Sequence, residues 1–181
     1  MEVATLGAGC FWRIQTIFSR VPGVISTVVG YAGGYVPNPT YQQVRTGTTG
    51  HAECIQIQFN PQIISYGRLL QVFFTSHDST QVNRQGQDFG TNYRSIILYH
   101  NPQQYRIATS YIQQLRTSYG LPVATQVAPY QAFYPAENYH QFYEVRKQQP
   151  QLLVQQQQPQ LFAQQQQQSM LMLSPSVMMF Q

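Results

Sequence analysis

The sequence predicts an α+β fold in which helices cover a mixed β-sheet. Three observations carry this prediction. Segments typical of strands recur between segments with helical periodicity, so both kinds of element occur along the whole chain. The length of 181 residues is enough for one domain with a hydrophobic core. Hydrophobic residues make up 43% of the chain and charged residues only 9%, and glutamine takes many of the polar positions.

The chain begins with a predicted strand, helix and strand. Residues 3–8 are mostly apolar and end in a small-residue turn, Gly7-Ala8-Gly9. Residues 11–20 place apolar side chains at helical spacing, so a helix starts directly after this turn. Pro22-Gly23 predicts the next turn, and the β-branched residues at 24–31 predict a strand.

A long connection and an alternating strand follow. Residues 30–50 are rich in Gly, Pro, Asn and Thr, and we expect either an ordered loop or a short helix near 41–44. Residues 53–59 alternate between polar and apolar side chains, which predicts a half-buried strand. Because neighbouring strand residues point to opposite faces, Glu53 and Cys54 should face away from each other.

The second half repeats the alternation. Residues 65–74 predict a helix and residues 77–91 a loop. A strand at 95–99, a helix at 102–119 and a last strand at 123–128 follow.

The composition changes near Gln148. We predict a short helix at 135–143, a catalytic domain at 1–150, and a Gln-rich, low-complexity tail at 151–181. The tail has too little apolar surface to fold alone, so we expect it to be disordered or weakly helical.

Charge and cysteine content exclude several classes of function. The net charge is +4, but the basic residues are scattered and only Arg146-Lys147 are adjacent, so we expect no nucleic-acid binding. Two cysteines do not make a disulfide framework. We find no secretory signal, and no segment has the roughly 18 apolar residues of a membrane span. We therefore expect a cytoplasmic protein without a membrane partner.

Cys10 is the first candidate for chemistry. It lies where the first strand meets the first helix, and a helix N-terminus lowers a thiol's pKa. A buried structural cysteine is the alternative for an isolated Cys. Acyl transfer is another, and it would need a base from the four histidines, His51, His77, His100 and His140.

Cys10 belongs to the first of six motifs that follow one another along the chain. They are Gly9-Cys10-Phe11-Trp12, Gly30-Tyr31-Ala32-Gly33-Gly34, Asn38-Pro39-Thr40-Tyr41, Gly50-His51-Ala52-Glu53, the run from His77-Asp78 to Arg94-Ser95, and Glu137-Asn138-Tyr139-His140-Gln141. In order and spacing they resemble the motifs of the peptide methionine sulfoxide reductase A family, and six such matches are far more specific than one. The resemblance spans about residues 2–150 and implies a ferredoxin-like core and reduction of methionine S-sulfoxide, free or in proteins.

The resemblance implies catalytic roles for five residues. Cys10 would attack the sulfoxide and become a sulfenic acid. Glu53 would donate the proton to the sulfoxide oxygen, for which it must stay protonated near neutral pH. Tyr41 and Tyr93 would bind that oxygen, and Asp88 would orient the network.

We assign Phe11, Trp12 and His51 to substrate binding. The two aromatic side chains would form an apolar pocket for the substrate's methyl group. His51 has a second interpretation, as a hydrogen-bond partner that stabilises a loop. No Cys/His pair has zinc-like spacing, so we expect no metal.

Two departures from the family pattern affect the predicted cycle. Gln15 stands where the family usually has Glu. The family's C-terminal resolving Cys is missing, because residues 149–152 read Gln-Pro-Gln-Leu. Cys54 should not reach Cys10, so we predict a one-cysteine cycle with no bound cofactor.

The expected partners are an oxidised protein or free methionine sulfoxide and an external reductant. That reductant would be thioredoxin, glutaredoxin or a small thiol, and we expect a monomer. The alternative is a non-catalytic interaction protein that keeps the fold and binds partners through the Gln-rich tail.

Overall fold

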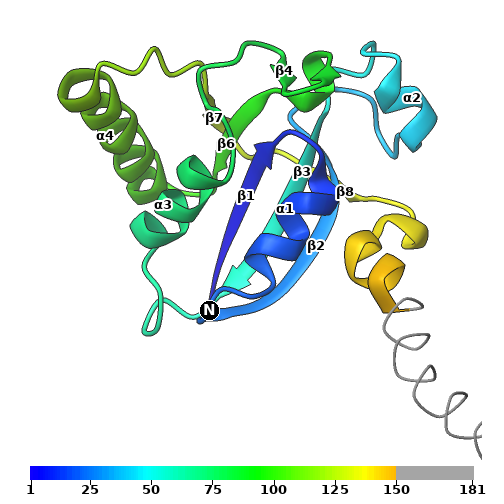
Figure 1. Ribbon diagram of the computed structural model, residues 1–181, viewed down its shortest axis with the longest axis horizontal. Coiled ribbons are helices and arrows are strands. Elements are labelled where there is room, and N and C mark those ends of the chain that lie inside the picture. Colours follow the sequence, from blue (N-terminus) through cyan, green and yellow to red (C-terminus); the bar gives the residue numbers. More distant parts are fainter. Residues whose placement is uncertain (150–181) are drawn as a thin grey trace, which may run out of the picture. The chain divides into compact units, whose positions relative to one another are not determined.

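A six-stranded mixed β-sheet is the framework of the described chain (Figure 1). The structure, a computed structural model, describes residues 1–149. The strand order is β7-β6-β1-β3-β2-β8; β6 and β7 are parallel and the other neighbours antiparallel. The strands of this sheet are β1 (Glu2–Ala8), β2 (Val24–Ala32), β3 (Ala52–Phe59), β6 (Ser95–Tyr99), β7 (Gln126–Pro129) and β8 (Phe133–Pro135).

The centre of the sheet has the ferredoxin-like arrangement. The helices are α1 (Phe11–Phe18), α2 (Tyr41–Arg45), α3 (Tyr66–Ser76) and α4 (Pro102–Tyr119). In chain order β1, α1, β2, β3, α3 and β6 form a βαββαβ unit, and its strands lie in the order β6-β1-β3-β2. Helix α4 then leads from β6 to the parallel strand β7, and β8 pairs with β2. The predicted α+β class and ferredoxin-like core are confirmed.

Capping residues explain where the helices begin and end. Ser65 caps α3 by accepting a hydrogen bond from the N–H of Arg68. Asn101 caps α4 in the same way, and Gly120 ends that helix in the left-handed conformation, with φ of 64°. The predicted helix at 102–119 and strand at 95–99 are confirmed with their bounds.

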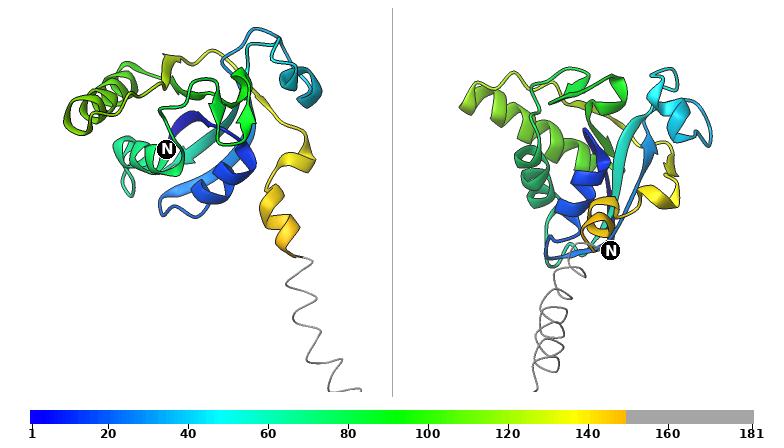
Figure 2. Two further views of the ribbon diagram at one scale, coloured as in Figure 1. Left: turned by 45° about the horizontal axis from the view of Figure 1, so that its top comes forward. Right: turned by 45° about the vertical axis from the view of Figure 1, so that its right-hand side comes forward.

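The two faces of the sheet bury different clusters. Helices α1, α3 and α4 lie on one face (Figure 2) and pack Phe11, Phe73 and Ile112 against the strands. On the other face, Cys54 packs in a smaller cluster that includes Ile96. Side chains of neighbouring residues in β3 therefore lie on opposite faces of the sheet and pack in different clusters.

Two segments differ from the sequence-based prediction. The predicted helix at 135–143 is wrong: strand β8 ends at Pro135, and only a 3₁₀ turn, Asn138–His140, follows. Phe142 has φ of +53°, which an α-helix cannot contain. The predicted loop at 77–91 contains a small hairpin.

That hairpin, β4 (Arg84–Gln85) with β5 (Asp88–Phe89), turns at Gly86, whose φ is +59°. A 3₁₀ turn, Thr91–Tyr93, follows it.

The chain divides into two units, Met1–Tyr143 and Glu144–Gln181. The described part of the second unit, residues 144–149, is helical. The predicted tail at 151–181 lies outside the described residues. Within residues 1–149, no helix has the length and apolar character needed to cross a bilayer.

Candidate active site

Cys10 lies at the N-cap of α1, directly beyond the end of β1 (Figure 1). The turn before it needs glycine at position 9. Gly9 has φ of +83°, and a Cβ there would come within 2.7 Å of the Gln85 side chain. The β4–β5 hairpin thus closes over the turn that carries the thiol.

The thiol is protonated at neutral pH, contrary to the expectation from the helix end. Burial, with smaller contributions from the charges of Glu53 and Asp88, raises the pKa of Cys10 to about 11. The N–H groups of Trp12 and Arg13 lower the pKa, as a helix N-terminus should, but their effect is smaller. The site therefore stores its nucleophile in the neutral form.

Glu53 is a buried carboxyl group beside this thiol. Its side chain is 2% exposed, and Oε2 accepts a hydrogen bond from the N–H of Phe11 at 3.1 Å. Burial, with a smaller contribution from the charge of Asp88, raises the pKa of Glu53 to about 8. The hydrogen bond from Phe11 and the charge of Arg45 act in the opposite direction without cancelling it. Glu53 consequently keeps a proton at neutral pH.

Two tyrosines and an aspartate come from separate elements to the same place. Tyr41 begins α2, Tyr93 ends the 3₁₀ turn after β5, and Asp88 begins β5. Burial raises the pKa of both tyrosine hydroxyls, and the charges of Glu53 and Cys10 raise each of them further. These shared electrostatic effects show that the structure brings all five predicted catalytic residues together.

Aromatic rings form a wall beside Cys10. The indole N–H of Trp12 donates to Nδ1 of His140 at 2.9 Å. The ring of Tyr143 stacks on the indole at 3.9 Å, with an interplanar angle of 17°. Phe11 and Tyr41 contact His140 from other sides, with ring centroids 5.3 and 4.4 Å away. A thiol, a neutral carboxyl and apolar rings suit a small uncharged polar group with an apolar substituent.

The comparisons with known proteins agree with this chemistry. The model of the family described as peptide methionine sulfoxide reductase matches residues 2–171. The chain belongs to the peptide methionine sulfoxide reductase family. It is an oxidoreductase that acts on methionine sulfoxide and so repairs oxidative damage.

Relatives and solved structures support the assignment. Peptide methionine sulfoxide reductase MsrA of Saccharolobus solfataricus is 56% identical over 140 residues, which are 77% of this chain and 79% of the relative. The MsrA of Geobacter sulfurreducens is 49% identical over 143 residues, 78% of this chain and 88% of the relative. Reduced Mxr1 from Saccharomyces cerevisiae has a TM-score of 0.76 at 33% identity, covering 80% of this chain and 84% of that one.

Mxr1 has also been solved in complex with Trx2. That structure has a TM-score of 0.55 at 23% identity and covers 78% of this chain and 84% of that one. At this identity the likeness shows the fold alone. The two forms of Mxr1 thus agree with the ferredoxin-like core seen in this member of the reductase family.

In this reductase, Glu137 is a site residue that the sequence did not reveal. Its Oε1 accepts from the hydroxyl of Tyr31 at 2.9 Å, and its Oε2 accepts from the N–H of Tyr41 at 3.2 Å. Glu137 thus holds the start of α2. Its place in the last motif and the scarcity of acids were the available signals, but neither indicates a partner 106 residues away.

His51, assigned to substrate binding from the sequence, makes the hydrogen bonds of its ring to a loop. Its ring is buried, Nδ1 accepts from the N–H of Gly34 at 3.0 Å, and Nε2 donates to the carbonyl of Val36 at 2.7 Å. Both ring nitrogens are thus engaged by the loop after β2. This geometry favours the loop-stabilising interpretation over substrate binding, which stays a prediction.

His77 and His100 also make structural contacts. His77 lies between the carbonyl of Phe73 and the hydroxyl of Ser95, each at 2.7 Å, and His100 bonds the hydroxyl of Thr5 at 2.8 Å. Burial lowers the pKa of His77 to about 4. These bonds engage both ring nitrogens of His77 and one of His100, and those of His51 are also occupied. His140 keeps Nε2 without a hydrogen-bond partner, but within residues 1–149 no hydrogen bond joins Cys10 to this or any other histidine, so acyl transfer is not favoured.

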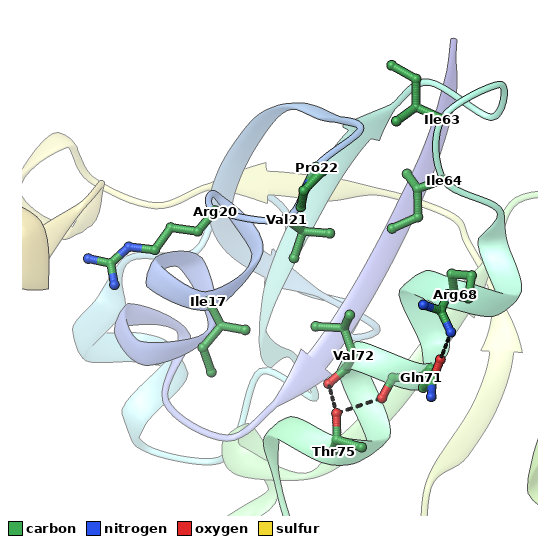
Figure 3. A pocket seen from close by; sticks show the side chains of 10 residues that line it. All are labelled: Ile17, Arg20, Val21, Pro22, Ile63, Ile64, Arg68, Gln71, Val72 and Thr75. Carbon is green, nitrogen blue, oxygen red and sulfur yellow. Dashed lines mark hydrogen bonds between the residues drawn. The ribbon is translucent and has the colours of Figure 1, made fainter.

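A separate cavity of about 580 Å³ lies between α1 and α3 (Figure 3). Ile17, Ile64 and Val72 line it, with Arg20 and Arg68 at its edges. No cysteine, histidine or carboxylate lines it, so it carries none of the predicted chemistry. Within residues 1–149, no group of three metal-ligating side chains is found.

Proposed function

We propose that this reductase converts methionine S-sulfoxide, free or in proteins, to methionine by a one-cysteine mechanism. The observation that carries the proposal is the pairing of Cys10 with a buried Glu53 whose pKa is raised to about 8. A sulfoxide oxygen is a poor leaving group until it is protonated. A carboxylic acid that keeps its proton at neutral pH can supply that proton.

The reductive step is balanced within the site. Glu53 protonates the sulfoxide oxygen while the sulfur of Cys10 attacks the sulfoxide sulfur. The protonated oxygen then moves to the sulfur of Cys10 as a hydroxyl: its bond to the sulfoxide sulfur breaks, the transient bond between the two sulfurs breaks with the electron pair left on methionine, and Cys10 becomes a sulfenic acid. The sulfoxide sulfur gains two electrons and the sulfur of Cys10 loses two. The thiol proton of Cys10 returns to Glu53, so no net proton is consumed.

The surrounding residues hold the substrate during this step. We assign the hydroxyls of Tyr41 and Tyr93 to the sulfoxide oxygen and Asp88 to the orientation of the network. Phe11 and Trp12 take the methyl group, which offers only apolar surface for recognition. Support comes from the convergence of these side chains on one place and from the aromatic wall around the indole.

Recycling requires a thiol from outside the chain. Cys54 is 1% exposed and packs on the sheet face opposite Glu53, so a Cys10–Cys54 disulfide would require a cysteine to cross the sheet. One external thiol would condense with the sulfenic acid, releasing water and leaving a mixed disulfide on Cys10. A second thiol would release Cys10 as a thiol.

We assign this reduction to thioredoxin, with glutaredoxin or a small thiol as the alternatives. The Mxr1–Trx2 complex supports a thioredoxin-like partner for that relative. We further propose action as a monomer in a reducing compartment such as the cytoplasm. The described site is built from one chain and depends on free thiols.

A single-turnover experiment tests the proposal. Pre-reduced enzyme is mixed with a methionine S-sulfoxide peptide without reductant, the methionine formed is counted per chain, and the protein is analysed by mass spectrometry. We expect one methionine per chain and one added oxygen on Cys10. Cys54→Ser should behave identically, because Cys54 takes no part. A Cys10–Cys54 disulfide would contradict the one-cysteine cycle, and absence of methionine would contradict the assigned activity.

A further inference from the structure

Gln15 lies on α1, one turn beyond Trp12, and its side chain is fully buried. Its Oε1 accepts from the N–H of Phe142 at 2.6 Å. Its Nε2 donates to the carbonyl of Thr27 in β2 at 3.3 Å and lies 3.5 Å from Oε1 of Gln141. One amide therefore joins the helix that carries the active-site residues to β2 and to a segment more than 120 positions away.

A second glutamine fixes the same distant segment. Oε1 of Gln141 accepts from the N–H of Val29 at 3.0 Å, and its Nε2 donates to the carbonyls of Val29 at 2.8 Å and Ala136 at 3.1 Å. The side chain thus pairs with β2 as a strand residue would. Phe142 follows with φ of +53°, a conformation that costs a non-glycine residue about 1 kcal/mol or more. Its hydrogen bond to Gln15 offsets that cost.

The residues on either side of this anchor hold the indole of Trp12. His140 accepts the indole N–H at 2.9 Å, and the ring of Tyr143 stacks on the indole at 3.9 Å. Residues 140–143 are here termed the strap. Two residues one turn apart on α1 thus contact the same segment: Gln15 binds the strap, and the strap contacts Trp12.

We propose that Gln15 is a positioning residue of the reductase: by anchoring the strap, it fixes the indole of Trp12 in the orientation that binds substrate. The link to substrate rests on the proposed function of the Trp12 pocket. The essential contact is the acceptor for the N–H of Phe142. A carboxylate at position 15, as the family usually has, would keep that acceptor and lose the bonds that the amide donates to Thr27 and Gln141.

Three variants separate positioning from stability. Gln15→Met keeps the size of the side chain and removes the hydrogen bonds of its amide to Phe142, Thr27 and Gln141. Gln15→Glu keeps the acceptor for Phe142 and is the conservative rescue. Gln104→Met is the matched control, because Gln104 is equally buried and its amide accepts from the N–H of His100 at 2.9 Å and donates to the carbonyl of Val3 at 2.8 Å, far from the strap.

The measurements use the single tryptophan of the chain. Acrylamide quenching of Trp12 fluorescence reports how firmly the indole is held, without substrate. Single-turnover kinetics on a methionine S-sulfoxide peptide gives KM and the rate at saturation. Gln15→Met should raise the quenching constant about threefold and KM about tenfold, with the saturated rate within about twofold, because binding geometry is lost while Cys10 and Glu53 stay.

The controls decide between the outcomes. Gln15→Glu should stay near the wild type, and Gln104→Met should lower the free energy of unfolding without changing quenching or KM. If Gln15→Met does not fold, Gln15→Asn, whose amide is too short to reach Phe142, replaces it with the same expectations.

Quenching and KM both unchanged in Gln15→Met would overturn the proposal, as would increased quenching with unchanged KM or a failure of Gln15→Glu to rescue. If the wild-type enzyme formed no methionine, the proposed function would fail. The quenching series would then still show separately whether Gln15 positions Trp12.

Discussion

Replacing Glu53 with Gln tests whether the site depends on a carboxyl group that keeps its proton. Burial, with a further contribution from the charge of Asp88, raises the pKa of Glu53 from 4.5 to about 8. Between these two values the folded protein binds a proton that the unfolded chain has released. Below pH 4.5 Glu53 is protonated in both states, so its raised pKa does not change the free energy of unfolding. As the pH rises from 4.5 towards 8, the free energy of unfolding falls progressively.

The size of this loss follows from the two pKa values. At about 1.4 kcal/mol per pH unit, the difference corresponds to about 3 kcal/mol at pH 7 and about 5 kcal/mol above pH 8. In Glu53→Gln, the amide has the same shape and no proton to release, and its oxygen can still accept from the N–H of Phe11. Relative to the wild type, the variant should become more stable as the pH rises.

Urea unfolding at pH 5, 7 and 9, followed by the fluorescence of Trp12, measures this difference. The advantage of Glu53→Gln should be small at pH 5 and near its full size at pH 9. The single-turnover rate should fall by about 10²- to 10⁴-fold, because the proton donor is gone. Glu2→Gln, at the opposite end of β1 from Cys10, is the control. A stability difference that is constant from pH 5 to 9, or a rate within tenfold of wild type, would refute the reasoning.

Three further predictions concern the surroundings of the thiol. The rate of iodoacetamide alkylation at Cys10 should rise about tenfold per pH unit towards pH 11, because burial suppresses the thiolate; a plateau below pH 8 would contradict this. Gly9→Ala should lower the free energy of unfolding by about 2 kcal/mol in urea, since φ is +83° and the new Cβ meets Gln85; no measurable loss would show that the hairpin yields. Glu137→Met removes the acceptors for the N–H of Tyr41 and the hydroxyl of Tyr31 and should raise KM about tenfold in peptide kinetics, with an unchanged KM counting against its role.

Local sequence signals predicted most of the fold. Helix α4 was predicted with its bounds from local periodicity, and in the structure Asn101 caps its start and Gly120 ends it. The β4–β5 hairpin was missed because two-residue strands show no periodicity. The segment at 135–143 was predicted wrongly, since its conformation depends on bonds from Gln141 to β2 that no local pattern reveals.

The site could be predicted only as far as its motifs extend. Cys10 and Glu53 were predicted as site residues because both lie in recognisable tetrapeptides. The structure then brings the two side chains together. The pKa of Cys10 was expected to be low, yet desolvation outweighs the helix end, whose effect is about 1 kcal/mol or less. The partnership of Trp12 with His140 spans 128 residues and needed the structure.

The resting protonation states explain how the thiol can be both protected and reactive. With pKa values of about 11 for Cys10 and about 8 for Glu53, both groups are neutral at pH 7, and so is the sulfoxide that they meet. A buried thiolate would be destabilised by desolvation and would react with any oxidant that reached it. In the proposed mechanism, Glu53 gives its proton to the sulfoxide, and the new carboxylate lies beside the thiol and can take its proton. In that mechanism the charge on one group disappears as charge on the other develops, so that Cys10 would become a nucleophile only when a sulfoxide is present to accept the proton of Glu53.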